Sequence, residues 1–217
     1  MSSHHIIRDK QEPALIIANG EACSLDLVEQ LLEWSPTVVV LDGALERVIS
    51  LGIKVDVWLG DFDHTNEADY RDYPLKKIHT PDQNLTDLEK AFEYLIEEGY
   101  PAVNVVWASG KRMDHTLNNF HSLVRYGRLL KIVFFDDYST SYLLPTSFEK
   151  WYPAGTPISL IPYGEAKNVA STGLKYDLNH PVLKLGTQTS SSNEAREDGI
   201  VKISYEDGAL ILMECHD

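Results

Sequence analysis

In the first two thirds of this 217-residue chain, short apolar runs alternate with segments of helical periodicity. The runs are continuous in Val, Ile and Leu, which is typical of strands buried on both faces. Strands and helices in alternation predict a Rossmann-like α/β domain, in which helices cover both faces of a mostly parallel sheet. The expected strands are 14–18, 37–41, 55–59, 77–79, 103–107 and 131–135.

Helices are expected in the intervals between these strands. The segment 86–98 has the clearest pattern, because its apolar residues recur at helical spacing and form one face. Thr86 and Glu89 have the spacing of a capping box, and Gly99 follows the last helical residue. The other helices are expected over 24–34, 44–51 and about 114–126.

The character of the sequence changes after Asp137. Glycines recur throughout the remainder, short strand-like pieces lie between them, and no helical period continues. This pattern predicts a small all-β domain, a sandwich or an open barrel. About 75 residues make a small core, so the domain is expected to be stabilised by packing against the first domain or a second subunit. The expected domains are 1–139 and 140–217, with strands at 158–161, 182–185, 200–203 and 209–213.

Charge and composition exclude several classes of function. The net charge of −14 leaves no basic surplus to neutralise a nucleic-acid backbone, although bound magnesium would still permit a nucleotide ligand. No apolar run approaches the roughly twenty residues that span a bilayer, and the first residues lack the apolar core of a signal peptide. Cys23 and Cys215 lie far apart in sequence, so a cytoplasmic protein with reduced thiols is expected.

Polar and glycine residues follow the expected strands at the point where each strand ends. Ligands of open parallel sheets bind beyond these carboxyl ends. Asp61 and Asp63 would project to the same side of an extended segment, and a divalent cation is the simplest reason for two carboxylates to lie so close. Each segment alone would be an ordinary turn, but together they indicate a metal-dependent site for an anionic ligand. The segments are 19–20, 42–43, 60–63, 80–87 and 109–115.

Each of these residues also has a simpler explanation. Asp42 is suited to cap the helix that follows it, and Asp87 suits the first turn of a helix without any ligand. Lys90, one turn later, is placed to pair with Asp87. Arg112 is either a solvated loop charge or a phosphate contact. For His115, a structural role at a helix start ranks slightly ahead of catalysis.

Several familiar nucleotide and hydrolase motifs do not occur in the sequence. There is no Gly-x-x-x-x-Gly-Lys-Ser/Thr loop, no Gly-x-Gly-x-x-Gly fingerprint, no Gly-x-Ser-x-Gly elbow and no Cys/His zinc spacing. A nucleotide enzyme of this sequence would therefore depend on magnesium held by carboxylates.

Taken in order, the motifs resemble those of the thiamine pyrophosphokinase family over nearly the whole chain. The matching segments are 42–44, 60–63, 82–91, 110–119, 172–176 and 190–193. The resemblance implies transfer of a diphosphoryl group from ATP to the hydroxyl of thiamine, giving thiamine diphosphate and AMP. It also implies an N-terminal α/β domain that binds ATP and Mg²⁺, a C-terminal β-sandwich that binds thiamine, and a homodimer with active sites between its subunits.

The resemblance also implies roles for individual residues. Departures from the family pattern are Tyr176, where many relatives have Trp, and His64, where Ser is common. Asp87 or Asp61 is a hypothetical acceptor of the thiamine hydroxyl proton.

The catalytic residues are expected to be Asp61, Asp63 and Asp87, which with Asp42 would bind magnesium. The residues expected to bind ATP are Asn19, Gly20, Asp42, Lys90 and Arg112, and those expected to bind thiamine are Gln83, Asp114, Ser190 and Tyr176.

Three other functions remain open at this point. The enzyme alternative is a magnesium-dependent phosphoryl transferase that acts on a different alcohol. A catalytically silent nucleotide or thiamine sensor is disfavoured by the intact carboxylates at 61, 63 and 87. A structural interaction module would explain the β domain but not the convergence of acidic residues.

Overall fold

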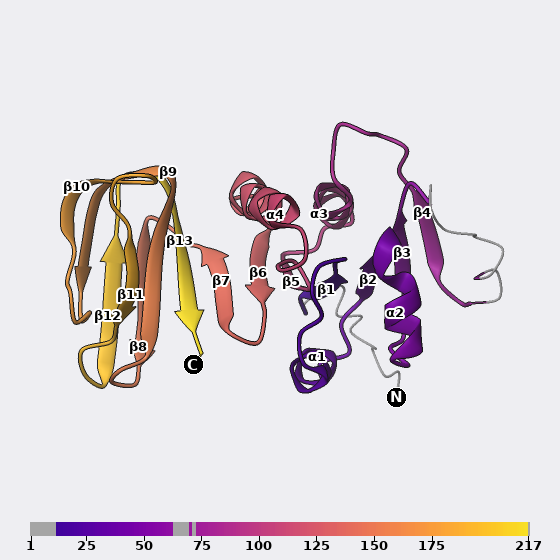
Figure 1. Ribbon diagram of the computed structural model, residues 1–217, viewed down its shortest axis with the longest axis horizontal. Helices are drawn as coiled ribbons and strands as arrows, with labels where there is room; N and C mark the ends of the chain where they lie inside the picture. The colour runs from indigo at the N-terminus through magenta and orange to yellow at the C-terminus, as the bar shows by residue number, and fades with distance from the viewer. Residues whose placement is uncertain (1–11, 63–69, 71–72, 217) are drawn as a thin grey trace, which may run out of the picture. The chain divides into compact units, whose positions relative to one another are not determined.

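The computed structural model describes residues 12–62, 70 and 73–216 (Figure 1). Its contacts divide the chain into two compact units. The first unit contains residues 1–112 and 129–131, and the second contains residues 113–128 and 132–217. No helix in the described part of the chain is long and apolar enough to cross a membrane.

The first unit is built on a parallel sheet whose strands run in the order β4-β3-β2-β1-β5. Ile16 at the centre of β1 pairs with Val39 of β2 on one side and with Val105 of β5 on the other. Every residue of β1, β2 and β3 is buried, whereas the edge strand β4 is largely exposed. The strands are β1 (Ala14–Ile17), β2 (Val38–Leu41), β3 (Val57–Gly60), β4 (Lys76–His79) and β5 (Ala102–Val106).

Helices of the first unit lie on both sides of this sheet. Figure 1 shows α1 and α3 on opposite sides of the row of strands, which explains why β1 to β3 are apolar at every position. A single 3₁₀ turn, η1 (Asp42–Ala44), connects β2 to the second helix. The α-helices are α1 (Leu25–Leu32), α2 (Leu45–Ser50) and α3 (Asp87–Glu97).

The start of α3 is fixed by a capping box. The backbone N–H of Glu89 donates to Thr86 Oγ1 over 3.4 Å, and the backbone N–H of Thr86 donates to Glu89 Oε2 over 3.0 Å. Two N–H groups at the helix start are thereby satisfied, as the sequence predicts. The helix ends before Gly99, whose φ of +79° is a conformation that glycine adopts without strain. Asp87 is consequently held in the first turn of α3.

The second unit is an antiparallel β structure with one helix, α4 (Met113–Tyr126). Its strands run in the order β6-β7-β13-β9-β12-β8, and β10 and β11 also pair with β9. A separate apolar core forms here from side chains such as Leu160, Leu183 and Leu212. The strands are β6 (Lys131–Phe135), β7 (Ser139–Leu143), β8 (Ser147–Tyr152), β9 (Pro157–Thr172), β10 (Asn179–Lys184), β11 (Ser190–Glu194), β12 (Gly199–Ser204) and β13 (Asp207–Cys215).

The structure confirms the predicted fold class, an α/β part followed by an antiparallel β part. It also adds strands that the sequence does not predict, namely β7, β8 and β11, and it extends the strand expected at 158–161 into the long β9. β9 continues through Pro162 and Gly164 because its pairing with β13 shifts register at this point, and an irregular pairing tolerates such residues. The domain boundary at 139/140 remains a prediction.

Candidate functional site

The loops at the carboxyl ends of β1, β2 and β3 are packed against one another through glycines. A methyl group on Gly60 would lie 2.4 Å from Asp42 Cβ, and one on Gly43 would lie 2.2 Å from Asn19 Nδ2. A methyl group on Gly20 would lie 2.3 Å from two backbone carbonyl oxygens of the loop after β5. Each of these distances is shorter than a real Cβ contact, so a neighbouring atom would have to move to admit a side chain. Four consecutive loops are therefore in direct contact at this edge of the sheet.

The turn at Asn19 and Gly20 is held in place by two basic side chains. Arg47 Nη2 donates to Gly20 O over 3.0 Å and to Asn19 Oδ1 over 3.4 Å. The same guanidinium lies 4.5 Å from the centroid of the buried Trp107 ring, a cation–π distance. Lys111 Nζ donates to Asn19 O over 3.2 Å. The expected roles in ATP binding do not include Arg47, because a lone arginine one turn into a helix has no motif to identify it.

Three carboxylates influence one another at this edge. Asp42 is buried, with 8% of its surface exposed. Asp61 accepts a hydrogen bond of 2.9 Å from Gln83 Nε2. Burial raises the pKa of Asp87, Lys90 opposes that rise, and the negative charges of Asp61 and Asp42 raise the pKa further. A bound cation would relieve this repulsion, so the donor set suits a divalent metal.

The acidic site is not complete within the described residues. Asp63, the fourth expected carboxylate, lies outside them. Among the residues that are described, no three Asp, Glu, His or Cys side chains come together closely enough to hold a metal. Two buried polar atoms of this edge, Arg47 Nε and Thr80 Oγ1, have no hydrogen-bond partner within the described part of the chain. Buried polar groups are nearly always satisfied, so these two atoms need a partner that the described residues do not supply.

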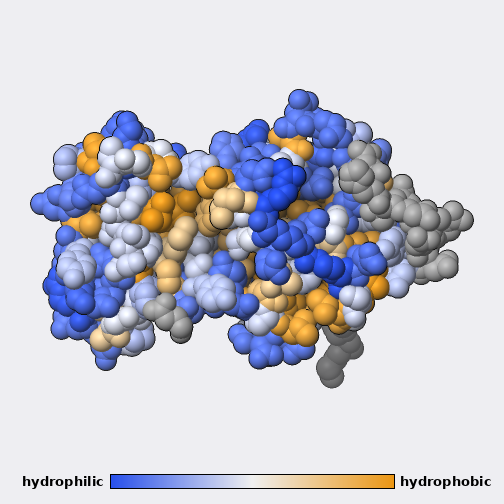
Figure 2. All heavy atoms as spheres, in the orientation of Figure 1, coloured by the Kyte–Doolittle hydropathy of each residue, from blue (hydrophilic) through white to orange (hydrophobic). Residues whose placement is uncertain are grey.

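Lys90 is buried, with 6% of its surface exposed. Its Nζ donates to Thr80 O over 2.9 Å and lies 3.4 Å from Asp87 Oδ1. The pairing with Asp87 that the sequence offers as the simpler explanation is therefore present. Contact between Lys90 and ATP remains a prediction. Figure 2 shows hydrophilic side chains gathered over the loop between β4 and α3, which carries Gln83.

Two of the expected thiamine-binding residues, Tyr176 and Ser190, are connected through one side chain in the second unit. The ring of Tyr176 is largely exposed, at 65%, whereas Ser190 in β11 is 9% exposed. The side chain of Asn193 connects them: it hydrogen bonds to the backbone of Tyr176 and donates to Ser190 Oγ over 3.2 Å. The expected roles do not include Asn193, because an asparagine in a serine-rich segment indicates only a turn.

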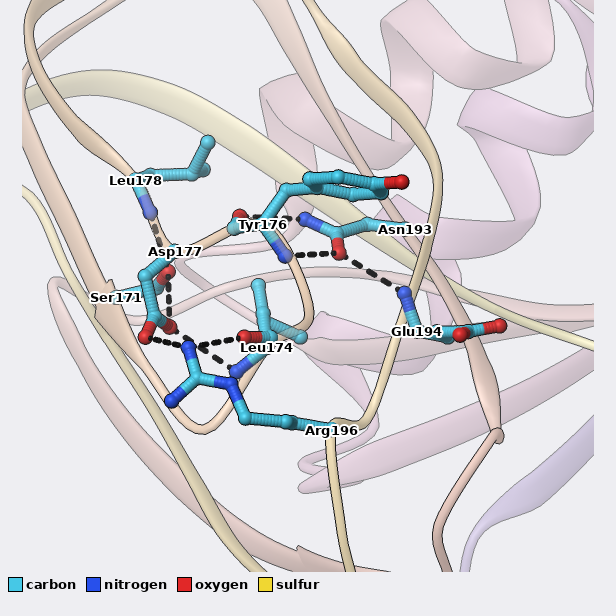
Figure 3. A network of polar contacts seen from close by, with 8 residues as sticks. All are labelled: Ser171, Leu174, Tyr176, Asp177, Leu178, Asn193, Glu194 and Arg196. Carbon is cyan, nitrogen blue, oxygen red and sulfur yellow. Dashed lines mark hydrogen bonds and ion pairs between the residues drawn. The ribbon is translucent and has the colours of Figure 1, made fainter.

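The segment around Tyr176 is fixed by an ion pair between Arg196 and Asp177. Asp177 Oδ1 also accepts a hydrogen bond from the backbone N–H of Leu174 over 3.0 Å, and Arg196 Nη2 donates to Leu174 O over 2.7 Å. The backbone N–H of Leu178 donates to Ser171 Oγ over 2.8 Å. Figure 3 shows these contacts as one continuous network around the Tyr176 segment.

The remaining expected residues lie at the junction between the loop after β5 and α4. Arg112 is exposed and is the last residue of that loop before α4. Asp114 lies in the first turn of α4, where its Oδ1 accepts a hydrogen bond of 3.0 Å from the backbone N–H of His115. The structure thus brings together Asn19, Gly20, Asp42, Asp61, Gln83, Asp87 and Lys90 in the first unit, and Tyr176 and Ser190 in the second.

Two family models match the chain. The first, "Thiamin pyrophosphokinase, catalytic domain", matches residues 28–134, and the second, "Thiamin pyrophosphokinase, vitamin B1 binding domain", matches residues 147–210. The chain is 27% identical to thiamin pyrophosphokinase 1 of Caenorhabditis elegans over 206 residues, which cover 87% of this chain and 84% of the relative. It is also 27% identical to thiamine pyrophosphokinase of Bacillus subtilis over 194 residues, covering 83% and 84%.

Solved structures share the fold. The crystal structure of thiamine pyrophosphokinase from Bacillus subtilis superimposes with a TM-score of 0.80 at 24% identity, covering 95% of this chain and all of that one. The crystal structure of yeast thiamin pyrophosphokinase also gives 0.80, at 15% identity, covering 96% and 88%. At these identities the likeness establishes the fold only.

Proposed function

This chain belongs to the thiamin pyrophosphokinase family, a family of enzymes, and we propose that it transfers the diphosphoryl group of ATP to the hydroxyl of thiamine. The products are thiamine diphosphate and AMP. The single observation that carries the proposal is that both domain models of the family match in order. The acidic carboxyl edge of the first unit supports it, since such an edge suits a metal-bound polyphosphate. The matched segments also support a division into domains near residue 140.

Mg²⁺ is the proposed metal, and Asp42, Asp61 and Asp87 would hold it together with Asp63. Support comes from Asp87, whose pKa is raised by burial and, against the opposing charge of Lys90, by the negative charges of the other two carboxylates. When bound, the ion neutralises charge on the polyphosphate oxygens during transfer. Arg112 is proposed to contribute a further positive charge to the phosphates.

The protein's own part in the reaction is mainly positioning. Diphosphoryl transfer depends on aligning the attacking hydroxyl with the phosphorus and on cancelling charge. Arg47 and Lys111 fix the Asn19–Gly20 turn, which is proposed to contact ATP together with Lys90. Gln83 orients Asp61 through its hydrogen bond. Asp87 or Asp61 is proposed to accept the proton of the thiamine hydroxyl, since both carboxylates lie at this edge of the sheet.

Thiamine is proposed to bind at Gln83, Asp114, Tyr176 and Ser190. The exposed Tyr176 ring supports this, because an aromatic face attracts a cationic thiazolium. The active assembly is proposed to be a cytoplasmic homodimer.

One assay tests the proposal. ATP and thiamine are incubated with the protein with and without MgCl₂, and AMP, ADP, thiamine monophosphate and thiamine diphosphate are quantified together. We expect equal amounts of AMP and thiamine diphosphate, formed only with the metal and abolished by a chelator. Accumulation of ADP or thiamine monophosphate would contradict the proposal. Tight thiamine binding in calorimetry without release of AMP would indicate a silent binding protein instead.

A further inference from the structure

β11 contains a bulge that brings two buried polar side chains to the same face. Ser190 pairs with Leu160 of β9 and Asn193 pairs with Ile158, so three steps along β11 match two steps along β9. In a regular strand, residues three positions apart point to opposite faces. The extra residue cancels this alternation, and both Ser190 and Asn193 are buried, the latter with 3% of its surface exposed. Ser192, within the bulge, has a φ of 55°.

Both the oxygen and the nitrogen of the Asn193 side-chain amide form hydrogen bonds. Its Oδ1 accepts from the backbone N–H of Tyr176 over 3.1 Å and from that of Glu194 over 2.9 Å. Its Nδ2 donates to Tyr176 O over 2.8 Å and to Ser190 Oγ over 3.2 Å. Figure 3 shows the amide of Asn193 beside the backbone of Tyr176. Both backbone groups of Tyr176 are therefore fixed by one buried side chain.

These contacts determine what Tyr176 and Ser190 present to a ligand. With its backbone fixed, the exposed Tyr176 ring retains only its own side-chain torsions. Because Asn193 donates to Ser190 Oγ, the hydroxyl hydrogen of Ser190 is directed away from Asn193 and towards another acceptor. An aromatic face and a hydroxyl donor are thus held at a set separation. Such preorganisation lowers the entropy lost when a flat ligand binds.

We infer that Asn193 is a positioning residue for thiamine, and that the β11 bulge places it beside Ser190 so that one amide fixes both Ser190 and Tyr176. The inference rests on the proposed function. Asn193 acts through its two neighbours and makes no contact with the reacting atoms. Its loss should weaken thiamine binding and leave ATP binding intact.

The test uses two variants of the full-length protein. Asn193→Asp keeps acceptors for the two backbone N–H groups but loses both donors, and Asn193→Ala loses donors and acceptors. We expect the KM for thiamine to rise roughly tenfold or more, the factor that corresponds to one lost hydrogen bond of ordinary strength. The KM for ATP should stay within about twofold of wild type. Asn179→Asp, an exposed amide on β10 of the same unit, is the matched control and should leave both constants unchanged.

A purely structural role would give a different pattern, namely less folded protein with both KM values unchanged. A folded Asn193→Ala protein with wild-type KM for thiamine would therefore overturn the inference. Calorimetry with thiamine alone separates this failure from failure of the proposed function. If wild type makes no thiamine diphosphate, the function is wrong, and the Asn193 variants are then judged by their Kd for thiamine. Equal Kd values for wild type and Asn193→Ala would count against the inference.

Discussion

The carboxylates at the carboxyl edge of the first unit's sheet differ in their hydrogen-bond and ion-pair partners. Asp61 is oriented by an amide donor, Gln83, whereas Asp87 faces the buried ammonium of Lys90. Environments that differ in this way separate the roles of neighbouring carboxylates. On this basis Asp61 is suited to hold metal, whereas Asp87 already has a cationic partner, Lys90, before any metal binds.

Asp61→Asn tests the role of Asp61 in holding metal. The substitution keeps the shape of the side chain but removes the charge, so the protein should fold and its kcat should fall about 100-fold or more. Circular dichroism and steady-state kinetics provide the measurements. Asp26→Asn, on the exposed first turn of α1, is the matched control and should retain wild-type turnover. Near wild-type activity of Asp61→Asn would remove Asp61 from the site.

In the second unit, one acidic residue determines part of the pH dependence of stability. Burial alone would raise the pKa of Glu214, but hydrogen bonds from Lys150, Tyr152 and Tyr142 outweigh burial, and its pKa lies below the ordinary value. The Lys150 Nζ is 2.7 Å and the Tyr142 hydroxyl 2.8 Å from Glu214 Oε1. A group whose pKa is depressed by folding stabilises the protein above its unfolded pKa. That stabilisation is lost as the pH falls through the folded pKa.

Glu214→Gln should therefore lower the free energy of unfolding at pH 7 by about 2 kcal/mol, since hydrogen bonds to a buried charge are lost. The difference from wild type should shrink as the pH falls below the ordinary pKa of glutamate and through the lowered pKa of Glu214, where the wild-type carboxylate becomes protonated. Urea unfolding at several pH values measures both effects. A difference that stays constant with pH would show that the charge of Glu214 does not contribute.

At the scale of elements, close contact between strand ends depends on glycine. Gly60 at the end of β3 leaves no room for a methyl group beside Asp42. Gly60→Ala should displace Asp42 and reduce kcat/KM about tenfold or more, with a loss of stability of about 1–3 kcal/mol. Gly199→Ala is the control, because a methyl group there meets no atom within 4 Å. Equal effects of the two substitutions would contradict this account of the strand ends.

The capping box of α3 links helix stability to the position of Asp87. Thr86→Ala removes the acceptor for the Glu89 N–H and should cost about 1 kcal/mol in the free energy of unfolding. Thr86→Ser retains the hydroxyl and should cost much less. Thermal and denaturant unfolding of the two variants give the comparison, and equal losses would indicate that the hydroxyl of Thr86 contributes nothing.

The elements also show why some of the fold is predictable and some is not. β1, β2 and the capped α3 are strongly patterned, because burial on both faces and capping each leave a local signal. β11 reads Ser-Ser-Ser-Asn-Glu and β7 reads Ser-Thr-Ser-Tyr-Leu, so neither has an apolar run. Their positions are determined by pairing with β9 and β13, which depends on residues distant in sequence. The same holds for Arg47 and Asn193, whose partners lie in other elements.

At the scale of the whole molecule, each unit has its own core and its own group of expected ligand residues. If the active sites lie between subunits of a homodimer, activity requires association. Light scattering during size exclusion should then give twice the mass of one chain. Specific activity should fall on dilution below the dimer Kd and recover on concentration. A monomer that keeps full specific activity at every dilution would contradict the homodimer proposal.

The contacts of the glycines in the first unit's loops also predict which Gly→Ala substitutions a second substitution can compensate. The obstacle at Gly43 is the tip of the Asn19 side chain, which can swing aside or be trimmed. At Gly60 it is the Cβ of Asp42, and at Gly20 it is backbone. Suppressor mutations that shorten the side chain should therefore arise at Asn19 for Gly43→Ala. Gly20→Ala meets backbone, which no side-chain substitution removes, and for Gly60→Ala only Asp42→Gly would remove the obstructing Cβ. At this edge of the sheet, a second substitution can therefore relieve the contact at Gly43 but not the contact at Gly20.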